Sequence, residues 1–366
     1  MKKINNFEIS SLIIIITVTL YAGINLGILK ESTGINSWFT VIISNIIGII
    51  PLLIYLYISN YQKELPINQK INTLFKKWGI LINIFLCLIF FTLCMTILYN
   101  INNYITSQLL YRTPHIVIAI LLMSLSTYHI SKGIDSITKV SFILLVFNII
   151  LSCICFFPLV PDINIENFMP ILQFGNNLIL PTAIKLASIN TLPIILISII
   201  PKEKSENLQK YNKNIIIAYL IGCIIALSII IQTYGVLGAN LVKLFEYPEY
   251  IVYKKITLIG FLERVENIIA SQWISGSYIY MTLIIYYIAN NINIKNQSVN
   301  KKNTIISIII AIILIAVKLT IFKNNTIFHN YTKKIFPYIC MSLFLFYIII
   351  SIKIFIEKRK KKLTSQ

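Results

Sequence analysis

The chain has 366 residues, of which 57% are hydrophobic and only 12% are charged, and its formal net charge is +19. A soluble domain carries about twice that charged fraction, so the composition excludes a soluble globular protein and indicates a polytopic membrane protein. A strongly basic chain can bind nucleic acid. Here the lysines lie mainly between apolar runs, where they act as topology signals, and no nucleic-acid partner is expected.

Apolar runs of about 20 residues, separated by polar segments, predict an all-α integral membrane protein with about ten transmembrane helices. The expected limits are 9–29, 38–59, 80–101, 116–130, 140–157, 178–200, 215–237, 268–289, 305–322 and 335–356. No small-residue cleavage site follows the first run, so we expect a retained span rather than a signal peptide.

The lysines and arginines lie mostly in the segments that share a side with the N-terminus. The positive-inside rule therefore predicts that both termini are cytoplasmic. The basic tail, 357–366, is expected to act as a stop signal that can also contact anionic lipid. Two longer outside connections, 158–177 and 238–261, do not resemble soluble domains, and a short surface helix is expected in the second. We therefore expect one transmembrane permease-like domain over residues 1–366.

The first apolar run is interrupted by the stretch Gly23, Ile24, Asn25, Leu26 and Gly27. Two glycines with an amide between them supply the low helix propensity and the free backbone groups of a discontinuous span. A bilayer tolerates such backbone only where protein covers it or where it lines a polar cavity. The alternative is a small-residue packing contact that lets another helix approach, with Asn25 bonding across it.

The sixth run is irregular as well, because it carries Pro181, Pro193 and the polar cluster Ser188, Asn190 and Thr191. Each proline removes a backbone hydrogen bond and clashes with the preceding turn. A kinked structural helix would also explain the prolines alone. The sequence predicts a second discontinuous span.

The positions of the two irregular spans favour a functional interpretation. Ten spans split into two inverted five-helix repeats, approximately 9–157 and 178–356, and the first and sixth spans are then equivalent. Interrupted helices at corresponding positions of inverted halves indicate a transporter-type site at the midplane. We therefore predict that a ligand binds where the backbone of residues 23–27 faces Ser188, Asn190 and Thr191 across one cavity.

Two lysines lie within apolar runs. Lys185 is about a third of the way into the sixth span, where a cation costs roughly 3 kcal/mol on insertion scales, so a coupling or gating role is one hypothesis and outward snorkelling is the other. Lys318 lies nearer its helix end, and we expect it to snorkel.

No other constellation indicates chemistry. Glu263, Arg264 and Glu266 at the start of the eighth span are expected to form a structural ion-pair cluster, or to contact a partner subunit. The six cysteines fall inside apolar runs without paired spacing, which predicts neither disulfides nor metal ligands. Without a nucleophile-base-acid set or a phosphate-binding loop, we expect no enzyme, no cofactor and no metal site.

The chain resembles a known family, the spore germination permeases of endospore-forming bacteria. The resemblance is most specific from Tyr247-Pro248 through Phe261-Leu262-Glu263-Arg264-Val265-Glu266 to Trp273. These residues are similar to the family's Tyr-Pro connection, its Phe-x-x-Arg-x-(Asp/Glu) helix start and a following tryptophan. One departure is that Ile189-Asn190-Thr191 stands where members often carry a Gly-Glu pair, which argues against assuming proton coupling there.

The resemblance implies the fold of the amino acid-polyamine-organocation superfamily, with an amino-acid-like ligand between the broken helices. It also implies partnership with an A subunit and a lipoprotein C subunit in the spore inner membrane. The leading hypothesis is thus a membrane subunit that senses a small nutrient and helps trigger germination. An active amino acid transporter and a non-binding assembly scaffold are the alternatives.

Overall fold

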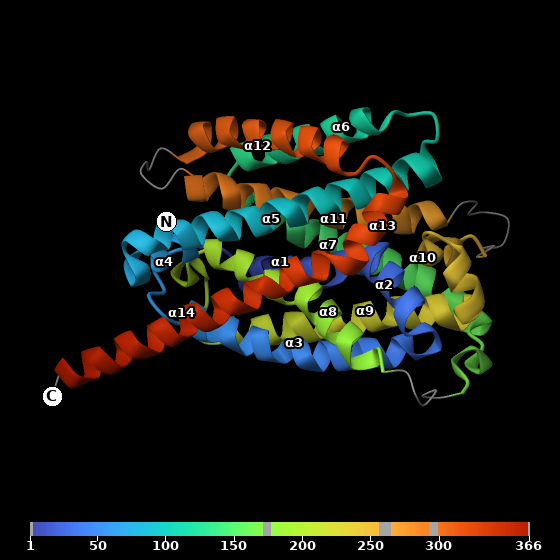
Figure 1. Ribbon diagram of the computed structural model, residues 1–366, viewed down its shortest axis with the longest axis horizontal. Coiled ribbons are helices and arrows are strands. Elements are labelled where there is room, and N and C mark those ends of the chain that lie inside the picture. Colours follow the sequence, from blue (N-terminus) through green and yellow to red (C-terminus); the bar gives the residue numbers. More distant parts are fainter. Residues whose placement is uncertain (1–2, 171–176, 256–264, 293–298, 365–366) are drawn as a thin grey trace.

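The computed structural model describes residues 3–170, 177–255, 265–292 and 299–364, and within them the chain is a bundle of helices (Figure 1). The helices are α1 (Asn6–Val18), α2 (Ile24–Ser32), α3 (Ser37–Ser59), α4 (Ile67–Phe75), α5 (Lys77–Tyr104), α6 (His115–Ser131), α7 (Ile134–Leu159), α8 (Ile179–Asn190), α9 (Leu208–Leu244), α10 (Pro248–Tyr253), α11 (Glu266–Ile292), α12 (Val299–Ile321), α13 (Asn325–Lys334) and α14 (Phe336–Thr364). The described residues contain no strand beyond one isolated bridge between Ile4 and Ser205.

The predicted all-α integral membrane class is confirmed. Over the described ranges, eight helices are long and apolar enough to cross a membrane, and the bent pair formed by α1 with its following turn and α2 supplies a ninth. The shorter apolar helix α6 corresponds to the remaining expected span. The inverted relation of the two halves stays a prediction.

Several spans extend beyond the limits expected from hydropathy. For example, α7 begins at Ile134, α9 reaches Leu244, and α14 continues through Thr364 into the basic tail. The reason is that charged and polar residues at a span's end leave the hydrocarbon layer without leaving the helix. Hydropathy therefore marks the membrane segment and not the helix end.

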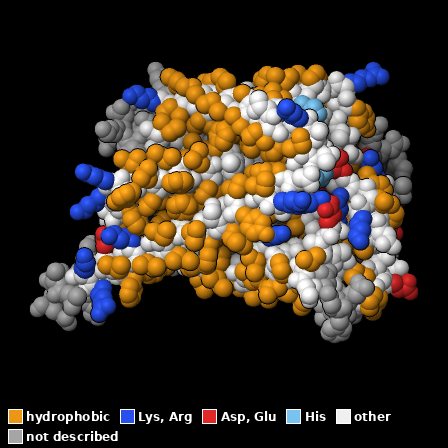
Figure 2. All heavy atoms as spheres, in the orientation of Figure 1, with side chains coloured by type: hydrophobic (Ala, Val, Ile, Leu, Met, Phe, Trp, Pro, Cys, Tyr) orange, Lys and Arg blue, Asp and Glu red, His pale blue; other side chains and the backbone are white. Residues whose placement is uncertain are grey.

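The exterior fits a bilayer. In Figure 2, apolar side chains cover the middle of the visible face, and most lysines and arginines lie toward its two ends. Both termini lie at the same end of the bundle (Figure 1). There the Ile4 amide donates to the Lys204 carbonyl over 2.7 Å, and the Tyr61 hydroxyl donates to Glu357 over 2.6 Å.

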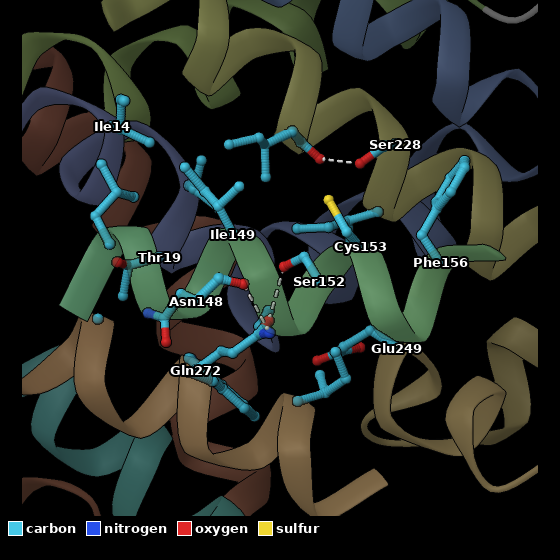
Figure 3. A pocket seen from close by; sticks show the side chains of 18 of the residues that line it. Ile14, Thr19, Asn148, Ile149, Ser152, Cys153, Phe156, Ser228, Glu249 and Gln272 are labelled. Atoms are coloured by element: carbon cyan, nitrogen blue, oxygen red, sulfur yellow. Dashed lines mark hydrogen bonds between the residues drawn. The ribbon is translucent and has the colours of Figure 1, made fainter. Parts of the chain in front are cut away.

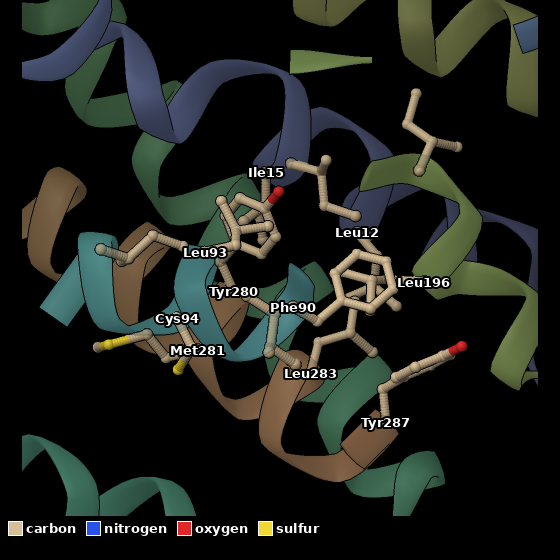
Figure 4. Packing of buried hydrophobic residues seen from close by; sticks show 14 of the residues in the cluster. Leu12, Ile15, Phe90, Leu93, Cys94, Leu196, Tyr280, Met281, Leu283 and Tyr287 are labelled. Carbon is tan, nitrogen blue, oxygen red and sulfur yellow. The ribbon is translucent and has the colours of Figure 1, made fainter. Parts of the chain in front are cut away.

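The interior is packed by apolar and aromatic side chains from distant parts of the chain. Figure 4 shows Leu12 and Ile15 of α1 beside Phe90 of α5 and Tyr280 of α11, all of them buried. The helices α7, α9 and α11 pack against α1, so the first span lies inside the bundle.

Two expectations are wrong. Lys318 does not snorkel, because its side chain is 2% exposed and its ammonium lies 5.5 Å from the centroid of the Tyr99 ring. The short helix expected at the surface of the outer connection exists as α10, but Pro248, Glu249, Tyr250, Val252 and Tyr253 are all buried. A helix with two tyrosines buries its aromatic rings, and α10 packs against both α9 and α11.

Candidate functional site

The first span is broken at Gly23. The α-helix ends at Val18, a short 3₁₀ turn covers Thr19–Tyr21, and the chain restarts as α2 at an angle of 47°. Gly23 has a φ of 77°, a conformation that residues with a Cβ rarely adopt. An added Cβ would also lie only 2.5 Å from the Oδ1 of Asn100. Both the bend and the close approach therefore require glycine at this position.

The backbone groups freed by the break are bound by two side chains from other helices. The Nδ2 of Asn100 on α5 donates to the Ala22 carbonyl over 3.1 Å. The Gly23 amide donates to the Oε1 of Glu249 on α10 over 2.7 Å. An open main chain inside a membrane needs such partners, because water is absent, and an acid is favoured at the N-terminus of a helix such as α2.

The sixth span is discontinuous in its hydrogen bonding. It is α-helical as α8 up to Asn190, and after Thr191 it continues as a 3₁₀ helix over Leu192–Ile199. The change occurs at the polar cluster just before Pro193, which has no amide hydrogen to continue the α pattern. Both interruptions thus lie at polar residues within otherwise apolar spans.

The two interruptions meet through their amide side chains. The Nδ2 of Asn25 donates to the Oδ1 of Asn190 over 2.8 Å, and both residues are at most 5% exposed. The Oδ1 of Asn25 and the Nδ2 of Asn190 have no hydrogen-bond partner in the described part of the chain. One buried acceptor and one buried donor are therefore free at the contact. Exchanging oxygen and nitrogen in both amides would again leave one acceptor and one donor free, each on the other residue.

The other predicted site residues lie around this contact. Ser188 donates to the carbonyls of Lys185 and Pro337, at 2.7 and 3.2 Å, and Thr191 lies 3.4 Å from the Tyr219 hydroxyl. Ile24 and Leu26 are buried in α2. A Cβ added to Gly27 would meet nothing within 4 Å, so space is available beside the contact on the α2 side.

The prominent cavity lies elsewhere than expected. It has a volume of about 400 Å³ and is bounded by α1, α7, α9, α10 and α11 (Figure 3). It reaches Thr19 and Ala22 beside the break, but none of residues 23–27, 188, 190 or 191 lines it. The direct bond between Asn25 and Asn190 brings the two predicted stretches into contact instead of leaving this cavity between them.

Glu249 is a residue that the sequence analysis missed. It bonds the break, lines the cavity (Figure 3) and is 4% exposed, and burial raises the pKa of its carboxyl group from 4.5 to about 7. Its position directly after Tyr247-Pro248 was the available signal. An acid on an aromatic helix that is too short to span the membrane could have been expected to enter the bundle.

The remaining predicted residues are not at the break. Lys185 is half-buried, with its ammonium 5.6 Å from the centroid of the Tyr338 ring. Tyr247 accepts a hydrogen bond from Asn103 and packs edge-on against Trp273, and Pro248 begins α10. Their predicted roles in gating and in partner contact stay predictions.

The ion-pair cluster expected at the start of the eighth span can be placed only in part. Glu266 begins α11, whereas Glu263 and Arg264 lie outside the described residues. Over the described ranges, no group of three or more histidines, cysteines and acids is arranged to hold a metal ion.

Comparison with known proteins agrees with the architecture. Residues 3–327 match a family model described as "Spore germination protein". The chain is also similar to "Spore germination protein XB" of Bacillus anthracis, with 22% identity over 366 residues that cover 98% of this chain and 99% of the relative. Because the family model matches nearly the whole of a chain whose described residues form eight or nine membrane-length apolar helices, the resemblance inferred from the Tyr-Pro block is confirmed, and the protein belongs to the spore germination protein family of multi-pass membrane permeases.

Proposed function

We propose that the protein is the membrane subunit of a spore germinant receptor, and that it senses a small nutrient, an amino acid, at the contact between its two interrupted spans. Its family membership supports a role in germination. The nutrient signal passes to receptor A and C subunits in the spore inner membrane. The excess of lysine and arginine at the end that carries both termini supports a cytoplasmic location for them.

The observation that carries the proposal is the pair of free amide atoms at the Asn25–Asn190 contact. A buried polar atom without a partner costs about 1–3 kcal/mol, and a binding site is where such a cost is recovered. The acceptor on Asn25 can receive a hydrogen bond from an ammonium group, and the donor on Asn190 can give one to a carboxylate. These are the two charged groups of an amino acid.

Transmission from this contact follows its bonds. Asn25 lies in the first turn of α2, and Gly23, which precedes that helix, is bonded to Glu249 on α10. A ligand that changes the position of α2 therefore also displaces α10, in the outer connection between α9 and α11. That connection is a suitable surface for passing the signal to a partner subunit.

The proposal is tested by the nutrient dose response of spores that carry Asn190→Leu or Gly27→Leu. Each substitution should raise the nutrient concentration required for germination while leaving the subunit level in the membrane unchanged. Asn290→Leu is the matched control, because this partly exposed amide lies at the far end of α11. An unchanged dose response in both site variants would reject the site.

Reconstituted vesicles separate sensing from transport. Nutrient binding without concentrative uptake supports a receptor. Ion-driven accumulation of the amino acid inside the vesicles would instead identify an active transporter, and failure of the intact complex to bind any amino acid would identify a scaffold.

A further inference from the structure

The cavity of about 400 Å³ is a groove between two helices that hardly touch each other. Its floor is formed by α1 and α11, and its walls are α7 and α9, which both pack on α1 but have no extensive contact with one another in the described structure. A volume of this size suits a small organic molecule. None of the residues assigned above to the nutrient contact lines it, so it is a separate place in the protein.

The groove opens on the side of the bundle that faces lipid. Ile149, Cys153 and Phe157 on α7 and Ile221 on α9 line it and are exposed. Deeper in the groove, Ile14, Ile15 and Val18 of α1 continue the apolar surface. A hydrocarbon chain can therefore enter from the bilayer and cover this surface.

The other end of the groove is polar and holds an acid with an unused oxygen. The Oε1 of Glu249 is bonded to the Gly23 amide, whereas its Oε2 is buried and has no hydrogen-bond partner within the described ranges. Tyr253 and Trp273 line the same end. A carboxylate oxygen beside aromatic rings favours a cationic group, which can donate to the oxygen and contact the rings.

The other polar groups in the groove already bond one another. The Nε2 of Gln272 donates to the Asn148 carbonyl over 3.0 Å, its Oε1 accepts from Ser152 over 3.1 Å, and the Oε1 of Gln232 accepts from the Tyr253 hydroxyl over 2.5 Å. Figure 3 shows Asn148, Ser152 and Gln272 joined in this way. Glu249 thus remains the lining acid that lacks a donor for one of its oxygens.

We propose that this groove is a second ligand site that binds an amphipathic primary amine, with the ammonium group at Glu249 and the hydrocarbon chain between α7 and α9. The ammonium supplies the donor and the charge that the Oε2 of Glu249 lacks. The chain displaces lipid from the apolar walls. Because Glu249 also bonds the break at Gly23, an amine in the groove acts on the first span without occupying the Asn25–Asn190 contact.

The test uses n-hexylamine, n-hexanol and n-hexanoate with the full chain in nanodiscs, after subtraction of the heat measured with empty nanodiscs. At about pH 8, where the Glu249 carboxyl is ionised, calorimetry should give at least about tenfold tighter binding for the amine than for the alcohol, and the weakest binding for the acid. Glu249→Gln should lower the affinity for the amine about tenfold and leave the alcohol unchanged. Glu166→Gln, at an exposed acid that does not line the groove, should leave both unchanged.

A second variant keeps the test independent of any folding defect caused by replacing Glu249. Cys153→Trp fills the groove from its exposed wall and should abolish amine binding, and in the wild type the amine should slow modification of Cys153 by N-ethylmaleimide. Equal affinity for amine and alcohol would show partition into the membrane only, and undiminished binding by the Cys153→Trp variant would place the amine elsewhere. Either result overturns the proposal. Asn190→Leu should retain amine binding, so this site and the nutrient site can fail separately.

Discussion

The side chain of Asn25, in the first turn of α2, donates a 2.8 Å hydrogen bond to the side chain of Asn190 at the last residue of α8. This bond joins the two interrupted spans at their interruptions, 165 residues apart in sequence. The first interruption is in turn bonded to α10 through Gly23 and Glu249. These two bonds connect α2 and the turn before it to both α8 and α10.

The two glycines of the first break should differ in what they tolerate. Gly23→Ala forces a Cβ into a φ of 77° and against Asn100, so we expect it to destabilise the protein by about 1–3 kcal/mol. Gly27→Ala meets nothing within 4 Å and should be neutral or slightly stabilising, because alanine favours the helix. Thermal unfolding in detergent measures both, and equal loss of stability in the two variants would contradict the conformational role of Gly23.

The bond between the two breaks can be measured by a double-mutant cycle. Asn25→Ala and Asn190→Ala each remove one partner and leave the other buried amide unsatisfied, at an expected cost of about 1–3 kcal/mol. The double variant should cost less than the sum of the single ones, because neither amide is then left with a lost partner. Strict additivity in unfolding experiments would show that the two amides do not interact.

Most of the apolar spans and the two interruptions could be predicted because their causes are local. Apolar runs of membrane length, Gly23 with Gly27, and Pro193 after a polar cluster are all visible in the sequence. Helix limits could not be predicted as well, since α7 and α9 continue through polar residues that hydropathy treats as loops. In α7 and α9 the backbone hydrogen bonds determine where the helix ends, whereas the hydropathy pattern marks where the lipid ends.

The contacts of the site could not be predicted, because they depend on tertiary placement. The sequence separates Gly23 from Glu249 by 226 positions. The short aromatic helix could indicate that its acid enters the bundle, but nothing in either segment indicates that the two residues meet. The same applies to Lys318, which hydropathy places near a helix end but which is buried, with its ammonium over the Tyr99 ring of α5. Burial of a charged side chain is decided by its neighbours.

Lys318 offers a test of that burial. Its ammonium lies above the Tyr99 ring and has no carboxylate partner in the described part of the chain. Replacing a buried charge by an apolar side chain of similar size is often neutral or stabilising by about 1–4 kcal/mol. Lys318→Met should therefore raise the unfolding temperature. Lys323→Met, in the connection between α12 and α13, should have little effect. A marked loss of stability in the first variant would show that the cation is needed for packing.

The pH dependence of stability should report on Glu249. Two charged groups act on its carboxyl group: Lys30 lowers its pKa and Glu246 raises it. The charge of Glu249 acts in turn on Tyr104, Tyr247 and Tyr253. Burial dominates and raises its pKa from 4.5 to about 7. Between pH 4.5 and about 7, the Glu249 carboxyl group is therefore protonated in the folded protein and ionised in the unfolded chain. The stabilising contribution is full below pH 4.5 and is lost as the pH rises through about 7, by about 3 kcal/mol in total.

Glu249→Gln removes this dependence while keeping an oxygen that can accept from the Gly23 amide. We expect the variant to unfold at a higher temperature than the wild type at about pH 9 and at a similar or lower temperature at about pH 5. Glu166→Gln, at an exposed acid of another outer connection, is the control and should change the unfolding temperature equally at the two pH values. A Glu249→Gln variant that is less stable than the wild type at the higher pH would show that the carboxylate is ionised and favourable in the folded protein, contrary to the effect of its burial.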